Sequence, residues 1–227
     1  MRRVIIPELL DTDAGTPAEV RASLRDLRFI NSWFGGVRTT AALVEEVARR
    51  TGQRTLSLLE VAAGSGYVPE RARARLRERG VELHPTLLDR SPAHLSNSRP
   101  ALVGDALALP VNQGSFDLVS CTLFAHHLEP EQLVRFVSEA LRVCRVAVLI
   151  NDLIRHPAHL LLVYAGFPLY RGRITRHDAP ASVRRAYTME EMRALLARAR
   201  PARLEFSRHY LFRMGVIAWK EAETRTA

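Results

Sequence analysis

The chain of 227 residues has only two cysteines and no long uninterrupted apolar run. Cys121 and Cys144 have no metal-type spacing, and two thiols suit a reducing compartment, so we expect a cytoplasmic protein. The longest apolar run, residues 159–170, contains a glycine and a proline and is shorter than the roughly 20 residues of a membrane-spanning helix. The apolar stretch after Met1 is too short for a signal peptide.

Lysine is almost absent, although the formal net charge is +9 and raises the question of a nucleic-acid partner. Lys220 is the only lysine, and the arginines are spread along the chain instead of forming one basic stripe. The densest group, at residues 71–79, alternates with alanine, leucine and glutamate, as a solvated helix face does. The spread of the arginines along the chain therefore argues against nucleic acid as the partner.

Strand and helix patterns alternate through the middle of the chain. Short apolar runs predict buried strands at residues 55–61, 81–88, 101–103, 116–121 and 145–150. Helical patterns between them lie at residues 69–79, 92–97 and 130–143. This alternation predicts an α/β fold with three layers, in which a mostly parallel sheet is covered by helices on both faces.

The flanking segments complete a predicted single domain. Two helices are expected at residues 17–34, with Thr16 as cap and Gly35-Gly36 as end, and at 37–50. A capping box at Thr188 begins a last helix, and residues 203–207 and 211–219, joined by 208–210, predict a closing strand pair. The predicted parts of the domain 1–227 are an arm with helices (1–52), a ligand-binding core (53–150), an insertion (151–187) and a C-terminal helix with strands (188–227).

The turn after the first strand carries the strongest functional signal. Ala62, Gly64 and Gly66 follow this strand, and glycines allow a tight turn and the close approach of a ligand. Such a turn suits a dinucleotide or S-adenosylmethionine. Glu60 favours S-adenosylmethionine, because a carboxylate repels a pyrophosphate but attracts an ammonium and a sulfonium. Pro69 also occupies the position of the third glycine of the dinucleotide fingerprint.

Two further acids follow the next two strands. Asp89, with Arg90 after it, can accept hydrogen bonds from both ribose hydroxyls through its two carboxylate oxygens. Asp105 can accept one from the adenine amino group, while the backbone amide of Ala106 reaches a ring nitrogen. Each acid alone is an ordinary loop residue, but three acids at the ends of three successive strands form a much more specific pattern.

These motifs resemble those of class I S-adenosylmethionine-dependent methyltransferases, and most of all the small-molecule branch that contains ubiquinone and menaquinone methyltransferases. The segments that carry the resemblance are Leu58–Gly66, Asp89, Gly104–Pro110 and Ser115–Val119. The resemblance implies a Rossmann-like sheet with an antiparallel C-terminal strand. One departure is Ala62, where the family usually has glycine; we expect cofactor binding to survive the added methyl group.

The resemblance also implies which further residues approach the cofactor. Ser120, Cys121 and Thr122, after the fourth strand, would line its methionine end. The arm helix often folds over the cofactor in this family, which would bring three of its residues near: Arg28, Asn31 and Trp33.

The acceptor side is expected beside His126 and His127, just past the fourth strand. A histidine there either acts as a catalytic base at neutral pH or makes a hydrogen bond at a helix entry. Residues 151–152 follow the fifth strand and should face the same site. We expect no metal site, because Pro157 separates His156 from His159 and no third ligand can be placed. The adjacent residues 177–178 (His-Asp) are read as a solvated loop pair in preference to a base with its orienting acid.

The insertion is the best candidate for acceptor specificity. Its apolar residues at 160–170 fit four alternatives: a lid over an apolar acceptor, structural core, an interface between copies or a membrane-surface patch. The sequence does not distinguish between these alternatives. Its arginines could attract an acidic or phenolate acceptor: Arg155, Arg171, Arg173, Arg176, Arg184 and Arg185.

The sequence therefore predicts transfer of a methyl group from S-adenosyl-L-methionine to an oxygen or carbon of a small, largely apolar acceptor such as a phenol, a quinone precursor or a polyketide. The alternatives are a non-catalytic binding module with this fold and an RNA or protein methyltransferase. The sequence at residues 121–124 (Cys-Thr-Leu-Phe) lacks the Asn/Asp-Pro-Pro-aromatic motif of base-nitrogen methylation. The oligomeric state stays open.

Overall fold

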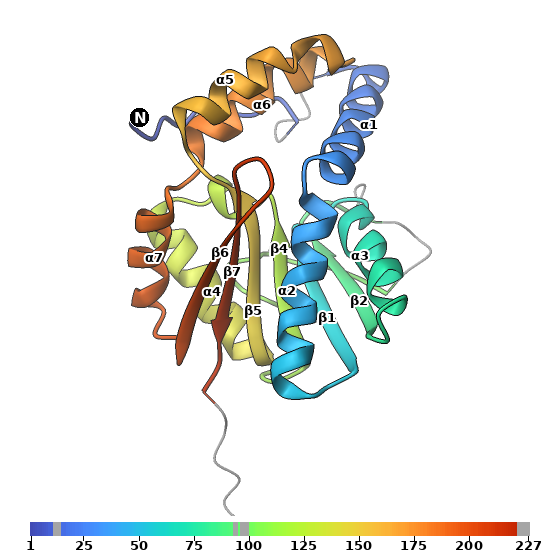
Figure 1. Ribbon diagram of the computed structural model, residues 1–227, viewed down its shortest axis with the longest axis vertical. Coiled ribbons are helices and arrows are strands. Elements are labelled where there is room, and N and C mark those ends of the chain that lie inside the picture. Colours follow the sequence, from blue (N-terminus) through green and yellow to red (C-terminus); the bar gives the residue numbers. More distant parts are fainter. Residues whose placement is uncertain (11–14, 93–94, 96–99, 222–227) are drawn as a thin grey trace, which may run out of the picture.

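A seven-stranded sheet with the strand order β3-β2-β1-β4-β5-β7-β6 forms the centre of the computed structural model, which describes residues 1–10, 15–92, 95 and 100–221 (Figure 1). Strands β1 to β5 run parallel, and β7 pairs antiparallel with both β5 and β6. The strands are β1 (Thr55–Val61), β2 (Glu82–Asp89), β3 (Ala101–Val103), β4 (Phe116–Thr122), β5 (Cys144–Leu153), β6 (Arg203–His209) and β7 (Arg213–Trp219).

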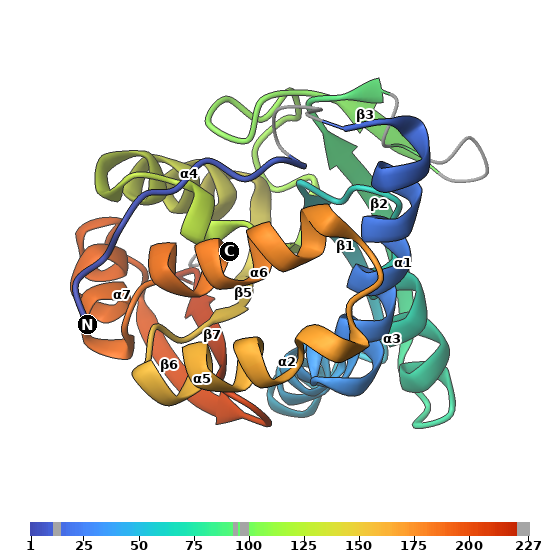
Figure 2. The same ribbon diagram turned by 90° about the horizontal axis from the view of Figure 1, so that it is seen from above.

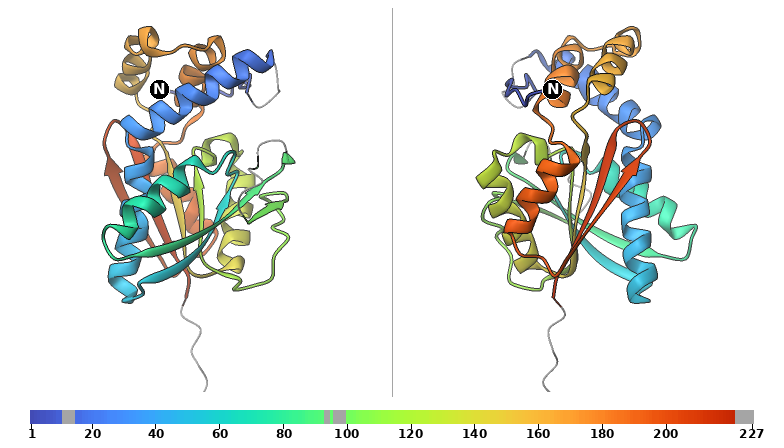
Figure 3. Two further views of the ribbon diagram at one scale, coloured as in Figure 1. Left: turned by 90° about the vertical axis from the view of Figure 1, so that its right-hand side faces the viewer. Right: turned by 60° about the vertical axis from the view of Figure 1, so that its left-hand side comes forward.

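Helices cover both faces of the sheet and its upper edge. They are α1 (Pro17–Trp33), α2 (Gly36–Thr51), α3 (Tyr67–Arg77), α4 (Pro130–Val143), α5 (Pro157–Ala165), α6 (Arg173–Arg185) and α7 (Met189–Arg198), with the short 3₁₀ helices η2 (Ala125–His127) and η3 (Phe167–Leu169). One apolar core lies between the sheet and α4 with α7, and a second between the sheet and α2 with α3 (Figure 3). The predicted three-layer α/β architecture is confirmed.

Local sequence explains where several helices begin. Thr16 and Thr188 each accept a hydrogen bond from the backbone of a glutamate three residues later, and both capping boxes are complete. Helix α4 begins at Pro130, as predicted, and buries Phe136 on its apolar stripe. Helix α3 begins at Tyr67, two residues before the predicted start, because Gly66 adopts a φ of +68° and caps it.

The predicted role of Gly35-Gly36 needs correction. Helix α1 ends at Trp33, and Gly35, with a φ of +87°, caps the start of α2. Gly36 is the first residue of α2 and lies against α1, where an added Cβ would come within 2.2 Å of Asn31 Oδ1. The two glycines therefore allow α2 to begin in close contact with α1, in addition to ending the first helix.

The predicted bounds of the strands after β4 are partly wrong. Strand β5 continues past Ile150 through Asn151 and Asp152, because these residues pair with β7. In the closing pair, β6 extends to His209 and β7 starts only at Arg213. The preceding Leu211 and Phe212 have positive φ values of 52° and 60°, and this left-handed backbone cannot continue a strand.

Helices α1, α5 and α6 form a cap above the edge of the sheet at which the parallel strands end (Figure 2). Asp26 of α1 is buried and accepts hydrogen bonds from the backbone amides of Arg171 and Gly172, both at 2.9 Å, which joins α1 to the start of α6. The N-terminal segment, residues 1–10, runs along the cap, and Val4 donates its amide to the carbonyl of Arg184 (3.1 Å). The cap therefore combines two segments far apart in the sequence.

Two further expectations concern a short helix at residues 92–97 and the ability of the helices to cross a membrane. The helix predicted at residues 92–97 lies largely outside the described residues. Among the described residues, every helix is too short or too polar to cross a membrane.

Candidate functional site

Backbone geometry at residues 62–66 forms a tight turn between β1 and α3. Ala62, Gly64 and Gly66 have φ values of 54°, 52° and 68°. The amide of Ala63 donates to the carbonyl of Leu88 (3.0 Å), which fixes the turn against β2. A Cβ on Gly66 would lie 2.6 Å from Leu87 Cδ1, so this position also needs glycine for space. Ala62, which replaces the usual glycine, retains the left-handed conformation.

Glu60 lies beside this turn with its side chain buried. The strand register places Glu60 next to Ser120 of β4 and Leu87 of β2. The Ser120 hydroxyl donates a hydrogen bond to the Glu60 carboxylate, and both side chains are almost completely buried. Burial raises the pKa of Glu60 to about 7, against the opposing effect of hydrogen bonds from Ser120 and Thr122. A cationic ligand at this edge would favour the ionised carboxylate.

Asp89 is the last residue of β2, and its carboxylate accepts a hydrogen bond from the glycine turn. Its Oδ2 accepts from the amide of Gly64 (2.9 Å) and its Oδ1 from the amide of Ser91 (3.0 Å). Each carboxylate oxygen has two lone pairs, so both can accept a further hydrogen bond from a ligand. Asp89 is thus placed both to order the glycine turn and to contact a ligand beside it.

Asp105 lies along the same edge, one strand further out. Strand β3 pairs with β2, and the amide of Gly104 donates to the carbonyl of Asp89 (3.1 Å). Asp105 is exposed, and its Oδ1 accepts from the amide of Leu107 (2.8 Å). Ala106 is half-buried and Arg90 is exposed. Asp89, the last residue of β2, and Asp105, two residues past β3, therefore lie at the ends of neighbouring strands, as the sequence predicted from their positions.

The residues predicted at the methionine end point to opposite faces of β4. Ser120 lies with Glu60, whereas the side chain of Cys121 belongs to the apolar core on the α4 face. Burial raises the pKa of the Cys121 thiol well above its usual value, so this thiol is neutral at physiological pH. Any contact of Cys121 with a ligand at this edge would fall to its backbone.

The three predicted residues of α1 have separate environments. The guanidinium of Arg28 lies over the ring of Tyr67, 5.8 Å from its centroid, at the start of α3. Asn31 is buried and accepts a hydrogen bond from Arg213 (3.0 Å), which is a structural contact. Trp33 is 70% exposed. Of the three, Arg28 is therefore the residue next to the helix that follows the glycine turn.

Past β4, His126 and Asp152 form a buried pair. Asp152 Oδ1 lies 2.7 Å from His126 Nδ1, and Asp152 Oδ2 accepts from the amide of His126 (2.9 Å). Burial opposes the charged imidazolium, but Asp152 and Glu8 outweigh it and raise the pKa of His126 to about 9. The pKa of Asp152 is lowered despite its burial, because His126 stabilises the carboxylate. The hydrogen bond to Asp152 fixes the orientation of the imidazole.

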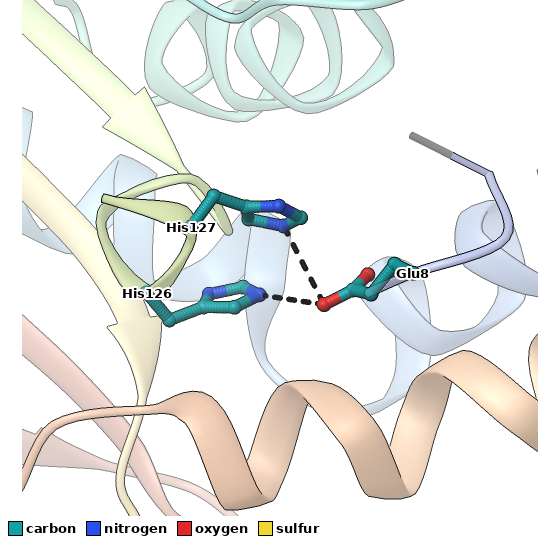
Figure 4. Close-up of side chains that lie close together, drawn as sticks. All are labelled: Glu8, His126 and His127. Atoms are coloured by element: carbon teal, nitrogen blue, oxygen red, sulfur yellow. Dashed lines mark ion pairs between the residues drawn. The ribbon is translucent and has the colours of Figure 1, made fainter. Parts of the chain in front are cut away.

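Glu8, from the N-terminal segment, is the residue of this region that sequence reasoning missed (Figure 4). Its Oε1 lies 3.5 Å from His126 Nε2 and 3.7 Å from His127 Nε2. The Ser182 hydroxyl of α6 donates to the same oxygen (2.7 Å). Burial would raise the pKa of Glu8, but the neighbouring histidines and Ser182 lower it. The amino-acid pattern around residue 8 contains no signal for this contact, which depends on the path of the segment across the cap.

The remaining histidines of the insertion have structural contacts. His156 and His159 both stack on the ring of Phe212, with centroids 5.1 Å and 5.2 Å away. The expectation of a solvated loop pair at residues 177–178 is wrong, because both residues lie in α6 and Asp178 is buried; His177 Nδ1 lies 2.8 Å from Asp178 Oδ1. Asp178, however, also accepts the amides of residues 9 and 10 (2.8 and 3.0 Å), so it holds the N-terminal segment.

The apolar insertion is partly core and partly exposed. Val163, Tyr170 and Val183 form a small apolar cluster inside the cap. Leu161, at 70% exposed, points outward, as do Leu162, Tyr164 and Leu169. Several of the arginines expected to attract an acceptor make internal contacts instead: Arg155 with Glu191 and the carbonyl of Ala186, Arg173 with Glu19, and Arg185 with the carbonyl of His127.

Comparison with known proteins agrees with this architecture. Residues 59–149 match the family model described as a methyltransferase domain. No curated protein matches the sequence. The plantazolicin methyltransferase BpumL, solved with a desmethylplantazolicin analogue and S-adenosylhomocysteine, is 12% identical with a TM-score of 0.70, over 94% of this chain and 93% of its own.

Two further structures have the same fold. A methyltransferase from Aquifex aeolicus, described as S-adenosylmethionine-dependent, is 14% identical with a TM-score of 0.52, over 78% of this chain and 89% of its own. Human N-acetylserotonin methyltransferase, solved with S-adenosylmethionine, is 13% identical with a TM-score of 0.61, over 89% of this chain and 56% of its own.

The fold is therefore that of the class I methyltransferases, with the glycine turn at the carboxyl edge of a seven-stranded sheet. Residues 59–149 match the methyltransferase-domain family, and two of the similar structures are described as dependent on, or in complex with, S-adenosylmethionine.

Proposed function

We propose that the protein transfers a methyl group from S-adenosylmethionine to an oxygen or carbon of a small, largely apolar molecule. The observation that carries this proposal is the row of acids Glu60, Asp89 and Asp105 on neighbouring strands around the glycine turn. Glu60 would face the ammonium of the methionine end, Asp89 the ribose and Asp105 the adenine. Ala62, Gly64, Gly66, Arg90, Ala106, Ser120 and Cys121 complete the proposed cofactor site, the last through its backbone.

The acceptor would lie between this site and the cap. Two of the similar structures belong to enzymes named for plantazolicin and N-acetylserotonin, which supports a non-macromolecular acceptor. Leu27 and Ile30 of α1 and Ala179 of α6 line a mainly apolar cavity in the cap, which supports an acceptor of low polarity. Methyl transfer is an in-line displacement at a carbon activated by the positive sulfur, so the protein mainly has to align the acceptor and exclude water.

We further propose that His126 and His127 activate the acceptor. An imidazole can do this by accepting the acceptor's proton or by holding a cation that lowers the acceptor's pKa. Because the pKa of His126 is raised to about 9, this imidazole is mostly protonated at neutral pH, and the proton-accepting role would belong to His127. His126 is the better oriented of the two, because Asp152 fixes its ring. In the described conformation its Nε2 faces Glu8, so the arm at residue 8 has a part in either role.

Cofactor binding tests the first proposal. In calorimetric titrations with S-adenosylmethionine, we expect saturable binding to the wild type and none to Asp89→Ala, which loses the ribose acceptor and the hydrogen bond that orders Gly64. Glu131→Gln, an exposed acid on α4, is the matched control and should bind normally. Binding to Asp89→Ala with wild-type affinity would remove Asp89 from the site.

Enzymatic turnover tests the second proposal, that His126 and His127 activate the acceptor. Formation of S-adenosylhomocysteine with a panel of phenolic and polyketide-like acceptors should be greatly reduced in His127→Ala and His126→Ala, while cofactor affinity stays largely intact. Cofactor binding without product for any acceptor would instead favour a non-catalytic binding module, and unchanged turnover in both variants would reject their role.

A further inference from the structure

Glu8, His126 and His127 bring three potential ligand atoms together although their chain positions are far apart (Figure 4). One carboxylate oxygen and two imidazole nitrogens all lie within 4.8 Å of one another. His126 is 2% exposed, Glu8 is 7% exposed and His127 is partly buried. A carboxylate with two imidazoles is the ligand set of catalytic zinc sites that keep one position open.

The separations in this cluster suit a shared cation better than direct hydrogen bonds. Glu8 Oε1 is 3.5 Å from His126 Nε2 and 3.7 Å from His127 Nε2. A hydrogen bond between nitrogen and oxygen spans about 2.7–3.2 Å. Two ligands at about 2.0–2.1 Å from one tetrahedral zinc ion are about 3.3–3.4 Å apart. Movements of a few tenths of an ångström would therefore bring Glu8 Oε1 to coordination distance with each histidine, and the two imidazole nitrogens, which lie within 4.8 Å of each other, would close on the same ion by side-chain rotation.

Partners outside the cluster orient two of the three ligands. His126 Nδ1 contacts Asp152 Oδ1 at 2.7 Å; a proton on Nδ1 leaves the lone pair on Nε2, as a metal ligand requires. Among the described residues, this buried Nε2 has no hydrogen-bond partner. The Ser182 hydroxyl donates to Glu8 (2.7 Å) and holds its carboxylate toward the histidines. Carboxylate–histidine support of this kind accompanies most metal-bound histidines.

The charges near the cluster are also relevant. Glu8 and Asp152 are two buried acids, so neutral imidazoles would leave two negative charges at the cluster. Arg213 offsets part of the charge of Asp152, and Arg3 donates to the carbonyl of His126 (3.3 Å). Either a proton on His126 Nε2 or a cation between the three ligands can balance the remainder.

We propose that Glu8, His126 and His127 bind one divalent transition-metal ion of the zinc type, with Asp152 and Ser182 orienting the ligands. Binding of the ion follows from the cluster itself. The proposed use of the ion is to coordinate an acceptor oxygen at its open position, and this use rests on the proposed function. The N-terminal segment would then supply a ligand to the acceptor side of the site.

The test uses the full chain, purified without a histidine tag and freed of metal with a chelator. Calorimetric titration with Zn²⁺ should show one tight site per chain, and Co²⁺ should give the visible absorption of a four-coordinate complex with nitrogen and oxygen ligands. Glu8→Gln and His127→Gln should weaken Zn²⁺ binding by about 100-fold or more, and Asp152→Asn by about 10- to 100-fold. His84→Gln, an exposed histidine on β2, is the control and should bind like wild type.

The outcomes separate this proposal from the one on which its use rests. Glu8→Gln preserves side-chain shape, and S-adenosylmethionine binding measured on the same samples reports whether each variant is folded. Wild-type protein that binds S-adenosylmethionine but no Zn²⁺ would overturn the metal site alone, and the proton on His126 would then hold the cluster. Undiminished Zn²⁺ binding in both Glu8→Gln and His127→Gln would also overturn it. Wild-type protein that binds Zn²⁺ but not S-adenosylmethionine would instead count against the proposed function.

Discussion

At the scale of single residues, Glu60 shows how burial can turn an ordinary acid into a sensor of its ligand. The residue lies one position before the end of the buried strand β1 and loses almost all contact with water, and Ser120 supplies a hydrogen bond in partial compensation. Its pKa of about 7 means that Glu60, with no cation beside it, is a mixture of neutral and ionised carboxyl at physiological pH. A cation beside it, such as the ammonium proposed here, would shift that mixture toward the carboxylate.

This predicts a pH-dependent affinity for S-adenosylmethionine. Because the ligand favours the ionised form, protonation of Glu60 below about pH 7 opposes binding, so affinity should fall about tenfold from pH 8 to pH 6. Calorimetric titration at several pH values measures this. Glu60→Gln should bind more weakly at pH 8 and lose most of the pH dependence. The same slope in wild type and Glu60→Gln would assign the dependence to another group.

At the scale of elements, the turn between β1 and α3 combines glycine with one strained alanine. A left-handed backbone costs a residue with a Cβ about 1–2 kcal/mol, and Ala62 adopts it at a φ of 54°. The turn retains this conformation because its neighbours fix it: Ala63 bonds to β2 through Leu88, and Gly64 to Asp89. Tertiary contacts thus hold a backbone conformation that the residue itself disfavours.

Ala62→Gly should therefore stabilise the protein. The relief of about 1–2 kcal/mol exceeds the roughly 0.4–1 kcal/mol of added freedom in the unfolded chain, so the free energy of unfolding should rise by about 0.5–1 kcal/mol. Urea unfolding measures it. Ala63→Gly is the matched control; its φ is not positive, and it should lose about 0.4–1 kcal/mol. A loss of stability in Ala62→Gly would show that the alanine methyl group makes a contact that outweighs the strain.

At the scale of the whole molecule, Arg213 connects the cap to the sheet. It begins β7, is 1% exposed, and donates to Asn31 Oδ1 (3.0 Å), to Asn151 Oδ1 (3.3 Å) and to the carbonyl of Phe34 (3.2 Å). Burial lowers its pKa to about 10, which leaves it charged at physiological pH. One side chain thus joins α1, β5 and the connection from α1 to α2.

Replacement of this guanidinium should weaken the entire fold. Arg213→Met leaves two buried acceptors and one part-buried acceptor without their donor, each worth about 1–3 kcal/mol, so the free energy of unfolding should fall by about 3 kcal/mol or more. The exposed Arg208, in the same hairpin, provides the control, and Arg208→Met should change it by less than about 0.5 kcal/mol. Chemical denaturation compares the two; similar effects would mean that the network around Arg213 adds little to stability.

The local sequence pattern was sufficient to predict the elements whose geometry depends on neighbouring residues in the chain. The strands around the glycine turn, the helix from Pro130 and the capping boxes at Thr16 and Thr188 are short-range features, and the structure has them where the sequence placed them. The hairpin before β7 differs, because the φ values of Leu211 and Phe212 depend on what the loop packs against. Phe212 stacks with two histidines of the insertion, more than 50 positions earlier in the chain.

The sequence by itself determined the α/β order and the placement of Glu60, Asp89 and Asp105. The local sequence pattern shows where each strand ends, and parallel strands end at one edge of the sheet. Only the tertiary structure decided which groups meet above that edge. Glu8 reaches His126 and His127 across some 120 positions of chain, through the cap that Asp26 and Arg213 hold in place. No local pattern encodes such a contact, since it depends on how separate elements pack and not on the preferences of any one of them.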